Sequence, residues 1–511
     1  MDDGNLRQIL HLGNGAEPVD LDPHVITGVT EFNIIRALLE GLVDENPHTL
    51  KPEPGAAERW EISADGLQYT FHLRGDARWS NGDPVTAHDF VFSFRRMLTP
   101  ALGARYAYML YPLKNAEQFH RGELDDFSQV GVRAEEEHTL HLELEHPVPY
   151  LLSLLTHNSW YPVHPPTVRA AGGEDRPGTR WTRPESFVGN GPFNLQSWEH
   201  GKRIIVTRSP TYWDRETVCL NEIHFHAISD SSIEERSFRA GQLHVTGTIP
   251  LDRIDWYRKN RPEVLRLDPY LGTYYFLLNV QRPPLDDVRV RRALAKAINR
   301  QAIVDYVTRG GEAPARHFTP EKLDAYETSA RLADSPESAR ALLAEAGYPG
   351  GEGFPQLQFL INTSDAHARI AQAVQQMWRE ELGISINIVN MEWQVYLATT
   401  QEGNYQIARA GWIGDYLDPN TFLDLWVTGG GNNRTGWSNT DYDEAVNAAA
   451  RTSDPQERMR YFDTAENILI REMPVIPLYF YRSKSLIQPA VRGWHPTLLD
   501  RHPYKHVWLE P

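Results

Sequence analysis

Residues 356–388 read QLQFLINTSDAHARIAQAVQQMWREELGISINI, and this stretch decides the fold. Residues 356–362 form a short apolar segment of the kind found in buried strands. Residues 365–382 have the spacing of an amphipathic helix, which Gly383 ends. The apolar residues on its stripe are Ile370, Val374, Met377 and Trp378. The alternating residues that follow are Ile384, Ile386 and Ile388. We therefore predict a βαβ unit with parallel strands and a right-handed crossover.

A different pattern precedes this unit, between residues 60 and 145. Apolar and polar residues alternate over 67–73 and again over 140–145, as in a half-exposed antiparallel sheet. Residues 83–98 are predicted to form a helix with Thr86 as its cap. Its apolar residues at helical spacing are Phe90, Phe94 and Met97. The chain thus combines a βαβ region with an antiparallel sheet.

Start and stop signals predict further elements in the second half of the chain. A Ser-Pro pair begins a helix over 335–347, and a Ser-Asp-Pro sequence begins another over 453–470. A strand is predicted at 476–481. We find no internal repeat or long flexible linker, so we expect domains joined by defined hinges.

Composition narrows the possible functions. A chain of 511 residues has room for two to four domains, and its net charge of −17 argues against a nucleic-acid partner. The single cysteine, Cys219, excludes a disulfide within the chain and any four-cysteine zinc centre. No apolar run approaches the roughly 18 residues of a membrane span. The N-terminus has no visible leader, although removal of a leader on export would leave the same sequence.

Motifs of catalysis are missing from the sequence. It contains no GxxxxGK[ST] loop, GxGxxG fingerprint, GxSxG elbow or HExxH helix. Four of the 20 histidines, considered as metal ligands, fall in separate predicted elements without ligand spacing. They are His72, His88, His120 and His141. We therefore predict no catalytic residue, no metal site and no cofactor.

One local cluster combines carboxylates with aromatic residues, as a ligand-binding site would. Strand-like IARAGW leads into a loop that carries Asp415 and Asp418 beside Trp412 and Tyr416. In one interpretation Asp418 begins a turn or caps a helix near Asn420, and Asp415 binds loop backbone. In the other, a carboxylate between aromatic rings needs a cationic partner, which a ligand ammonium would supply. The second interpretation suits Asp415 better than Asp418.

Residues 56–93, AAERWEISADGLQYTFHLRGDARWSNGDPVTAHDFVFS, form the longest of several segments that occur in a recognisable order. The others are LDPH (21–24), LLEGL (38–42), VGNGPFNLQSW (188–198), SPTYWD (209–214), DVRVRRALAKAINR (287–300), LLAEAGY (342–348) and AGWIGDY (410–416). Together they resemble family 5 of the bacterial extracellular solute-binding proteins, which serve peptide and nickel ABC transporters. Segments such as NTSDAHARIA and YFYRSKSL look most like the oligopeptide-binding members.

The resemblance implies an α/β fold with two lobes, the periplasmic-binding-protein fold of type II, cluster C, with a hinge between the lobes. Lobe I is expected at 1–41, 167–266 and 482–511, an extra α+β domain II at 42–166, and lobe III at 267–481. The lobes would close over a short peptide and deliver it to a permease driven by ATPase subunits. The resemblance also implies a monomer in the periplasm, or anchored by lipid outside the cytoplasmic membrane.

The resemblance also implies a ligand site. Asp415 would pair with the peptide's α-ammonium, and Arg409 with His367 would receive the carboxylate of a tri- or tetrapeptide. Backbone contacts are expected at Val29, Gly411 and Ile413. Aromatic neighbours of the ligand are expected at Tyr106, Trp393, Trp412 and Tyr481. Core packing for these aromatics, an internal salt bridge for Arg409 and a solvated His367 remain the alternatives.

Four positions depart from the oligopeptide pattern. Thr27 and Leu277 stand where the family has acidic pocket residues, and Gly247 and Thr248 replace paired asparagines. We expect a pocket that accepts basic side chains less readily. A dipeptide, murein tripeptide, opine or nickel-chelate carrier on the same fold is the first alternative, and a secreted hydrolase with paired carboxylates is the remote one.

Overall fold

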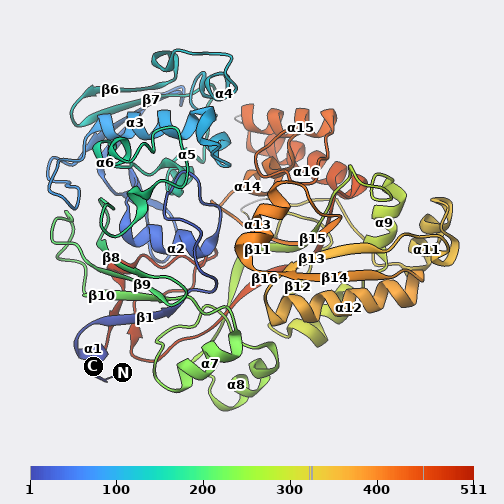
Figure 1. The fold of residues 1–511 in the computed structure, drawn as a ribbon. Helices are drawn as coiled ribbons and strands as arrows, with labels where there is room; N and C mark the ends of the chain where they lie inside the picture. Colours follow the sequence, from blue (N-terminus) through green and yellow to red (C-terminus); the bar gives the residue numbers. More distant parts are fainter. Residues whose placement is uncertain (1, 322, 324–325, 453) are drawn as a thin grey trace. The chain divides into compact units, whose positions relative to one another are not determined.

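The computed structural model describes residues 2–321, 323, 326–452 and 454–511, which fall into two compact units (Figure 1). Unit 1 consists of Met1–Ile228, Ile233–Gly247 and Leu486–Pro511. Unit 2 consists of Ser229–Ser232 and Thr248–Ser485. Among the described residues, no sheet joins strands of both units to any extent beyond the end of one strand, so each unit is described by itself.

Unit 2 is built on a six-stranded sheet with the order β12-β16-β11-β15-β13-β14. Its strands are β11 (Leu265–Leu278), β12 (Ala313–Pro314), β13 (Leu357–Asn362), β14 (Ile386–Met391), β15 (Ile407–Ile413) and β16 (Val475–Leu486). Its helices are α8 (Ile254–Asn260), α9 (Val288–Lys296), α10 (Arg300–Ala302), α11 (Pro336–Glu345), α12 (Asp365–Leu382), α13 (Trp393–Gln401), α14 (Asn420–Leu423), α15 (Thr440–Arg451) and α16 (Pro455–Glu472).

The predicted βαβ unit is confirmed. Strand β13 pairs with β14 in parallel, with Leu357 opposite Ile386, and α12 connects them (Figure 1). Helix α12 ends where predicted, because Gly383 adopts a left-handed backbone with φ of 67°. The stripe of α12 packs into the core of unit 2, where the Trp378 indole donates a hydrogen bond to the Leu294 carbonyl at 2.8 Å. The sheet is mixed, since β11 and β15 are antiparallel.

Unit 1 contains two four-stranded sheets and two antiparallel pairs of short strands, β2-β3 and β17-β18. The first sheet has the order β1-β10-β9-β8, and the second has the order β4-β5-β7-β6. The strands are β1 (Ile9–Gly13), β2 (Val43–Glu45), β3 (Pro52–Pro54), β4 (Ala57–Ile62), β5 (Gln68–Leu73), β6 (Val132–Glu136), β7 (Thr139–Glu143), β8 (Phe193–Glu199), β9 (Arg203–Arg208), β10 (Glu222–His226), β17 (Val491–Arg492) and β18 (Trp508–Leu509). The helices are α1 (Asp2–Leu6), α2 (Val29–Leu38), α3 (Ala87–Leu98), α4 (Ala116–His120), α5 (Leu151–Leu154), α6 (Pro165–Ala170) and α7 (Ser231–Arg239), whose first two residues are assigned to unit 2.

The antiparallel sheet predicted from alternation is also confirmed. Strand β5 pairs with both β4 and β7, and the paired residues Phe71 on β5 and Leu140 on β7 are fully buried. Helix α3 lies against β6 and β7. It begins with a capping box in which Thr86 and Asp89 exchange side-chain and backbone hydrogen bonds. The strand over 67–73 and the helix start at Thr86 could be predicted from sequence, because alternation and a capping box are both local signals.

The remaining predicted elements are found with small changes in length. Helix α11 begins after Ser335, whose hydroxyl accepts a hydrogen bond from the Ser338 amide. The predicted start of the later helix includes Ser453, which lies outside the described residues; α16 itself is capped by Asp454. Strand β16 is longer than predicted. The boundaries given above for three domains stay a prediction, because the two compact units do not test them.

Candidate functional site

The end of strand β15 in unit 2 has an open edge. Strand β15 is antiparallel to β11 along its whole length, but the pairing with β13 that the structure describes stops at Ala408. Beyond β15, the Gly414 amide donates to the Leu271 carbonyl at 2.8 Å. Since antiparallel bonds alternate along a strand, Gly411 and Ile413 direct their own N–H and C=O groups away from β11. These are the two positions predicted to offer backbone contacts.

The loop after β15 is braced around Asp415. The Asp415 amide donates to the Thr421 hydroxyl at 2.9 Å, and the Trp412 indole donates to the Thr421 carbonyl at 2.7 Å. One oxygen of the Asp415 carboxylate is buried from water. The loop thus holds a partly buried carboxylate directly beyond the open edge of β15, as the functional interpretation of this aspartate requires.

Asp418 has a structural partner. Its carboxylate accepts two hydrogen bonds from the Arg458 guanidinium and one from the Asn420 amide, at 2.6–2.9 Å. The hydrogen bond from the Asn420 amide agrees with the predicted turn at Asp418, and α14 begins at Asn420 as expected, but the cap of this helix is Pro419. Sequence analysis did not anticipate the ion pair, since Arg458 lies on α16, far along the chain.

A third carboxyl group, Asp424, was missed by sequence analysis. Its side chain accepts a hydrogen bond from the Asn420 amide group at 3.1 Å, and its other oxygen is buried. Burial, followed by the charges of Asp415 and Asp418, raises the pKa of the Asp424 carboxyl well above its ordinary value. The protonated form of Asp424 is therefore favoured far more than in water, beside the Asp415 carboxylate. The sequence around Asp424, TFLDLW at 421–426, carries no signal for this, because the effect comes from burial.

Arg409 on β15 is surrounded by neutral groups. Its guanidinium donates to the Tyr481 hydroxyl at 2.9 Å and to the Asn362 side chain at 3.2 Å, and it lies 4.9 Å from the centre of the Tyr274 ring. Burial alone would lower the pKa of Arg409, but the neighbouring tyrosines, Tyr481 first, raise it. Among the described residues no carboxylate forms an ion pair with Arg409, and its Nε is buried without a hydrogen-bond partner.

His367 lies beside this arginine. It is in the first turn of α12, and its Nδ1 is 3.3 Å from the Tyr274 hydroxyl. Burial, and then the charge of Arg409, lowers the pKa of His367 well below its ordinary value. The structure therefore brings His367 and Arg409 together around Tyr274, and it does not support a solvated His367.

The predicted aromatics of unit 2 lie next to these groups. The Tyr481 ring covers Gly411, since a Cβ on that glycine would come within 2.4 Å of the Tyr481 hydroxyl. Trp393 stacks on Tyr396 with ring centres 6.2 Å apart, and the Tyr396 hydroxyl donates to the Arg409 carbonyl. A side chain at position 411 would therefore press on the Tyr481 hydroxyl, which accepts the hydrogen bond from the Arg409 guanidinium.

The other predicted positions are placed as follows. Leu277 is buried on β11 opposite Ala408, and Thr248 is exposed in unit 2. Unit 1 holds Thr27, Val29, Tyr106 and Gly247. Val29 is exposed at the start of α2, and Tyr106 is buried with its ring centre 4.7 Å from that of His157. The contacts described here are all within one unit. The roles of these positions in binding a ligand therefore stay predictions.

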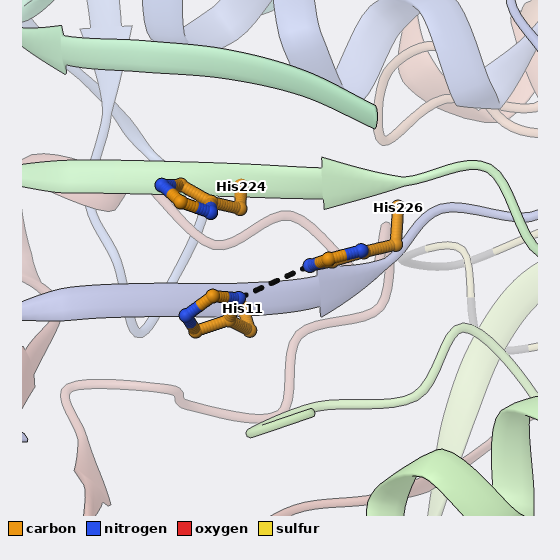
Figure 2. A group of neighbouring side chains, drawn as sticks. All are labelled: His11, His224 and His226. Atoms are coloured by element: carbon orange, nitrogen blue, oxygen red, sulfur yellow. Dashed lines mark hydrogen bonds between the residues drawn. The ribbon is translucent and has the colours of Figure 1, made fainter. Parts of the chain in front are cut away.

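Unit 1 also contains a histidine cluster that sequence analysis missed. The ligand nitrogens of His11, His224 and His226 lie within 4.8 Å of one another (Figure 2). A signal was available, because His-Phe-His at 224–226 places two imidazoles on one face of a strand. The third ring comes from β1, more than 200 residues earlier, and its approach depends on strand pairing.

Among the described residues, no helix has the length and apolar character needed to cross a membrane.

Comparison with known proteins connects the geometry to a family. Residues 51–434 match the family described as bacterial extracellular solute-binding proteins, family 5 Middle. The chain is 36% identical over 509 residues to the periplasmic oligopeptide-binding protein OppA of Salmonella typhimurium, covering 96% of this chain and 90% of that protein.

Two solved structures share the fold over nearly the whole chain. One is the Escherichia coli murein tripeptide binding protein MppA, with a TM-score of 0.94, 32% identity and 98% coverage of both chains. The other is Haemophilus influenzae OppA in complex with the peptide RPPGFSPFR, with a TM-score of 0.93, 34% identity and coverage of 98% of this chain and 99% of that one.

Proposed function

Because the chain belongs to family 5 of the bacterial extracellular solute-binding proteins, we propose that it is the peptide-capturing component of an ABC importer. The family consists of transport proteins that bind a substrate. This chain would bind short oligopeptides outside the cytoplasmic membrane and present them to a permease with its ATPase subunits. The similarity to OppA and MppA supports this assignment.

The observation that carries the proposal is the open edge of β15, which has a carboxylate beyond one end and a guanidinium near the other. An extended peptide would add itself as a strand along Gly411 and Ile413, exchanging main-chain hydrogen bonds. These bonds are common to all peptides. Binding by this edge therefore gives affinity without strong dependence on sequence.

The termini of the peptide would be recognised by charge. Its α-ammonium would pair with Asp415, and its carboxylate would meet Arg409, whose guanidinium offers a planar fork. His367 would donate to the same carboxylate through its ring N–H. Trp393, Trp412 and Tyr481 would flank the ligand, and Val29 and Tyr106 are proposed as further contacts.

The spacing of the charged groups favours short ligands. The Arg409 guanidinium lies at the Tyr481 hydroxyl, which itself covers Gly411. From residue 411 to Asp415 the chain can extend about 13 Å, at about 3.3 Å per residue. An extended tri- or tetrapeptide has the same length. A dipeptide would leave the carboxylate short of Arg409.

A murein tripeptide is the second candidate, because MppA is also structurally similar. Native mass spectrometry of the protein as purified from a bacterial periplasm tests both. Bound masses that differ by amino-acid residues would support a general peptide carrier, whereas a single discrete mass would favour the narrower ligand. Recovery of cleaved peptides after incubation, in place of stoichiometric binding, would contradict the transport role and favour a hydrolase.

A further inference from the structure

The histidine cluster of unit 1 is formed by two neighbouring strands. Strands β1 and β10 are parallel, and His11 stands opposite His224 in their register. His226 follows two residues later and therefore projects from the same face of the sheet. Figure 2 shows the three rings gathered on this pair of strands. Strand pairing thus fixes three imidazoles in one place without help from a loop.

The distances suit a shared metal ion. His11 Nδ1 and His226 Nε2 are 3.1 Å apart. Two imidazole nitrogens bound to one Zn²⁺ at about 2.0–2.1 Å in tetrahedral geometry lie about 3.3–3.4 Å apart, a few tenths of an ångström more than this separation. With both rings neutral, one nitrogen now donates to the other. A change of tautomer on the donating ring frees its lone pair without loss of a proton.

His224 is oriented by a carboxylate. Its Nε2 is 2.8 Å from Glu222 Oε2, so this nitrogen carries the proton and the lone pair is on Nδ1. The Nδ1 atom is buried and has no hydrogen-bond partner among the described residues, and the residue is only 8% exposed. A buried nitrogen without a donor is costly unless it serves another purpose. In metal sites, ligating histidines commonly donate their other N–H to a carboxylate in this manner.

We propose that His11, His224 and His226 bind one divalent first-row metal ion that prefers imidazole nitrogen, with Zn²⁺ as the reference, and that Glu222 is the positioning residue for His224. This site is separate from the open edge of β15 and does not depend on the peptide proposal. Carboxylate-preferring ions such as Mg²⁺ and Ca²⁺ do not suit it, because all three ligands are nitrogen.

A fourth histidine holds the site in position. His244 Nδ1 accepts a hydrogen bond from the His11 backbone amide at 2.9 Å, so its proton is on Nε2, which faces Asn5 Oδ1 at 3.0 Å. Both nitrogens of His244 are therefore engaged. We assign to it the alignment of β1 and no direct bond to the ion.

The surroundings allow access and leave the rings neutral. A cavity of about 600 Å³ is lined by the cluster, Arg7, Glu222 and His244. Burial, together with neighbouring histidines and Arg203, lowers the pKa of His11 and His226 to about 4. Arg203 is paired with Glu199 at 3.0 Å, which offsets its charge.

Titration calorimetry with Zn²⁺ alone tests the proposal on the full chain after treatment with a chelator. The protein carries Cys219→Ser, because that cysteine is exposed and binds zinc by itself. We expect one Zn²⁺ per chain and a rise in melting temperature on saturation. His224→Gln and His226→Gln should each weaken binding at least tenfold, and Glu222→Gln about ten- to a hundredfold.

The matched control is His88→Gln, since His88 is exposed on α3 of the same unit. It should leave Zn²⁺ affinity unchanged. Circular dichroism and the melting temperature without metal show that each variant is folded. Absence of stoichiometric Zn²⁺ binding to the parent protein, or equal affinity in folded His224→Gln and His226→Gln proteins, would overturn the proposal. Unchanged affinity in Glu222→Gln would overturn the role of that residue.

Discussion

Arg458 donates two hydrogen bonds to the Asp418 carboxylate, from Nη1 to Oδ2 at 2.6 Å and from Nη2 to Oδ1 at 2.7 Å. Both side chains are buried, and the pair ties α16 to the loop that follows β15. Two carboxylates in one loop therefore have different tasks. Asp418 anchors the loop by an internal ion pair, and Asp415 is held by the anchored loop.

Asp418→Asn should destabilise unit 2. The substitution leaves the Arg458 charge buried without its counter-charge, which costs about 3–5 kcal/mol. Thermal unfolding followed by circular dichroism measures the loss. Asp252→Asn is the control, because Asp252 is exposed in the same unit and should leave the melting temperature unchanged. Equal melting temperatures of the two variants would show that the ion pair does not anchor the loop.

Asp424→Asn should stabilise the protein, increasingly so as the pH rises. The raised pKa of Asp424 means that the folded protein holds a proton that the unfolded chain releases above about pH 4. Stability is therefore lost as pH rises from that value toward the raised pKa. Asparagine is neutral throughout and can still accept from Asn420. The melting temperatures of variant and parent should coincide near pH 4 and diverge by pH 8; a constant difference would contradict this explanation.

Arg409→Gln should weaken the binding of a tripeptide about thirtyfold or more, corresponding to about 2–5 kcal/mol for a charge left without its partner. It should also abolish the preference of the parent protein for a free carboxylate over a C-terminal amide. Competition binding with tri-alanine and its amide measures both effects.

The control for this experiment is Arg451→Gln, an exposed arginine on α15. It should bind both ligands as the parent does. If Arg409→Gln kept its preference for the carboxylate, the role of Arg409 would be confined to its contacts with Tyr481 and Asn362.

Peptides with basic side chains should bind less well than apolar ones of equal length. Thr27 and Leu277, two proposed pocket positions, carry no negative charge, so a ligand lysine would lose its hydration without gaining a partner there. Calorimetry with Ala-Lys-Ala and tri-alanine measures the difference. Equal affinities would show that these two positions do not determine the preference.

Local patterns predicted much of the fold, because their causes are local. The stripe on α12 and the glycine that ends it specify a helix, and the alternation around Phe71 specifies a half-buried strand, whatever the rest of the chain does. The elements of the βαβ unit were therefore found within a few residues. The pairing of β11 between β15 and β16 was not predictable in this way, since it joins segments more than 100 residues apart.

Site residues could be predicted from the sequence where their role depended on residue type. They could not be predicted where their role depended on tertiary packing. Asp415 could be singled out by its aromatic neighbours and its loop. The Arg458 partner of Asp418, the raised pKa of Asp424 and the approach of His11 to His226 all arise from residues that meet only after folding. No spacing in the sequence reports such contacts, because they follow from tertiary packing.

The central claim is that Asp415 receives the α-ammonium of a short peptide, and calorimetry tests it most directly. Tri-alanine is titrated into the parent protein, Asp415→Asn and the Asp252→Asn control, and N-acetylated tri-alanine is titrated into the parent. We predict that Asp415→Asn weakens binding by about 2–5 kcal/mol, that Asp252→Asn binds normally, and that the acetylated peptide binds poorly. An unchanged dissociation constant for Asp415→Asn would contradict the claim.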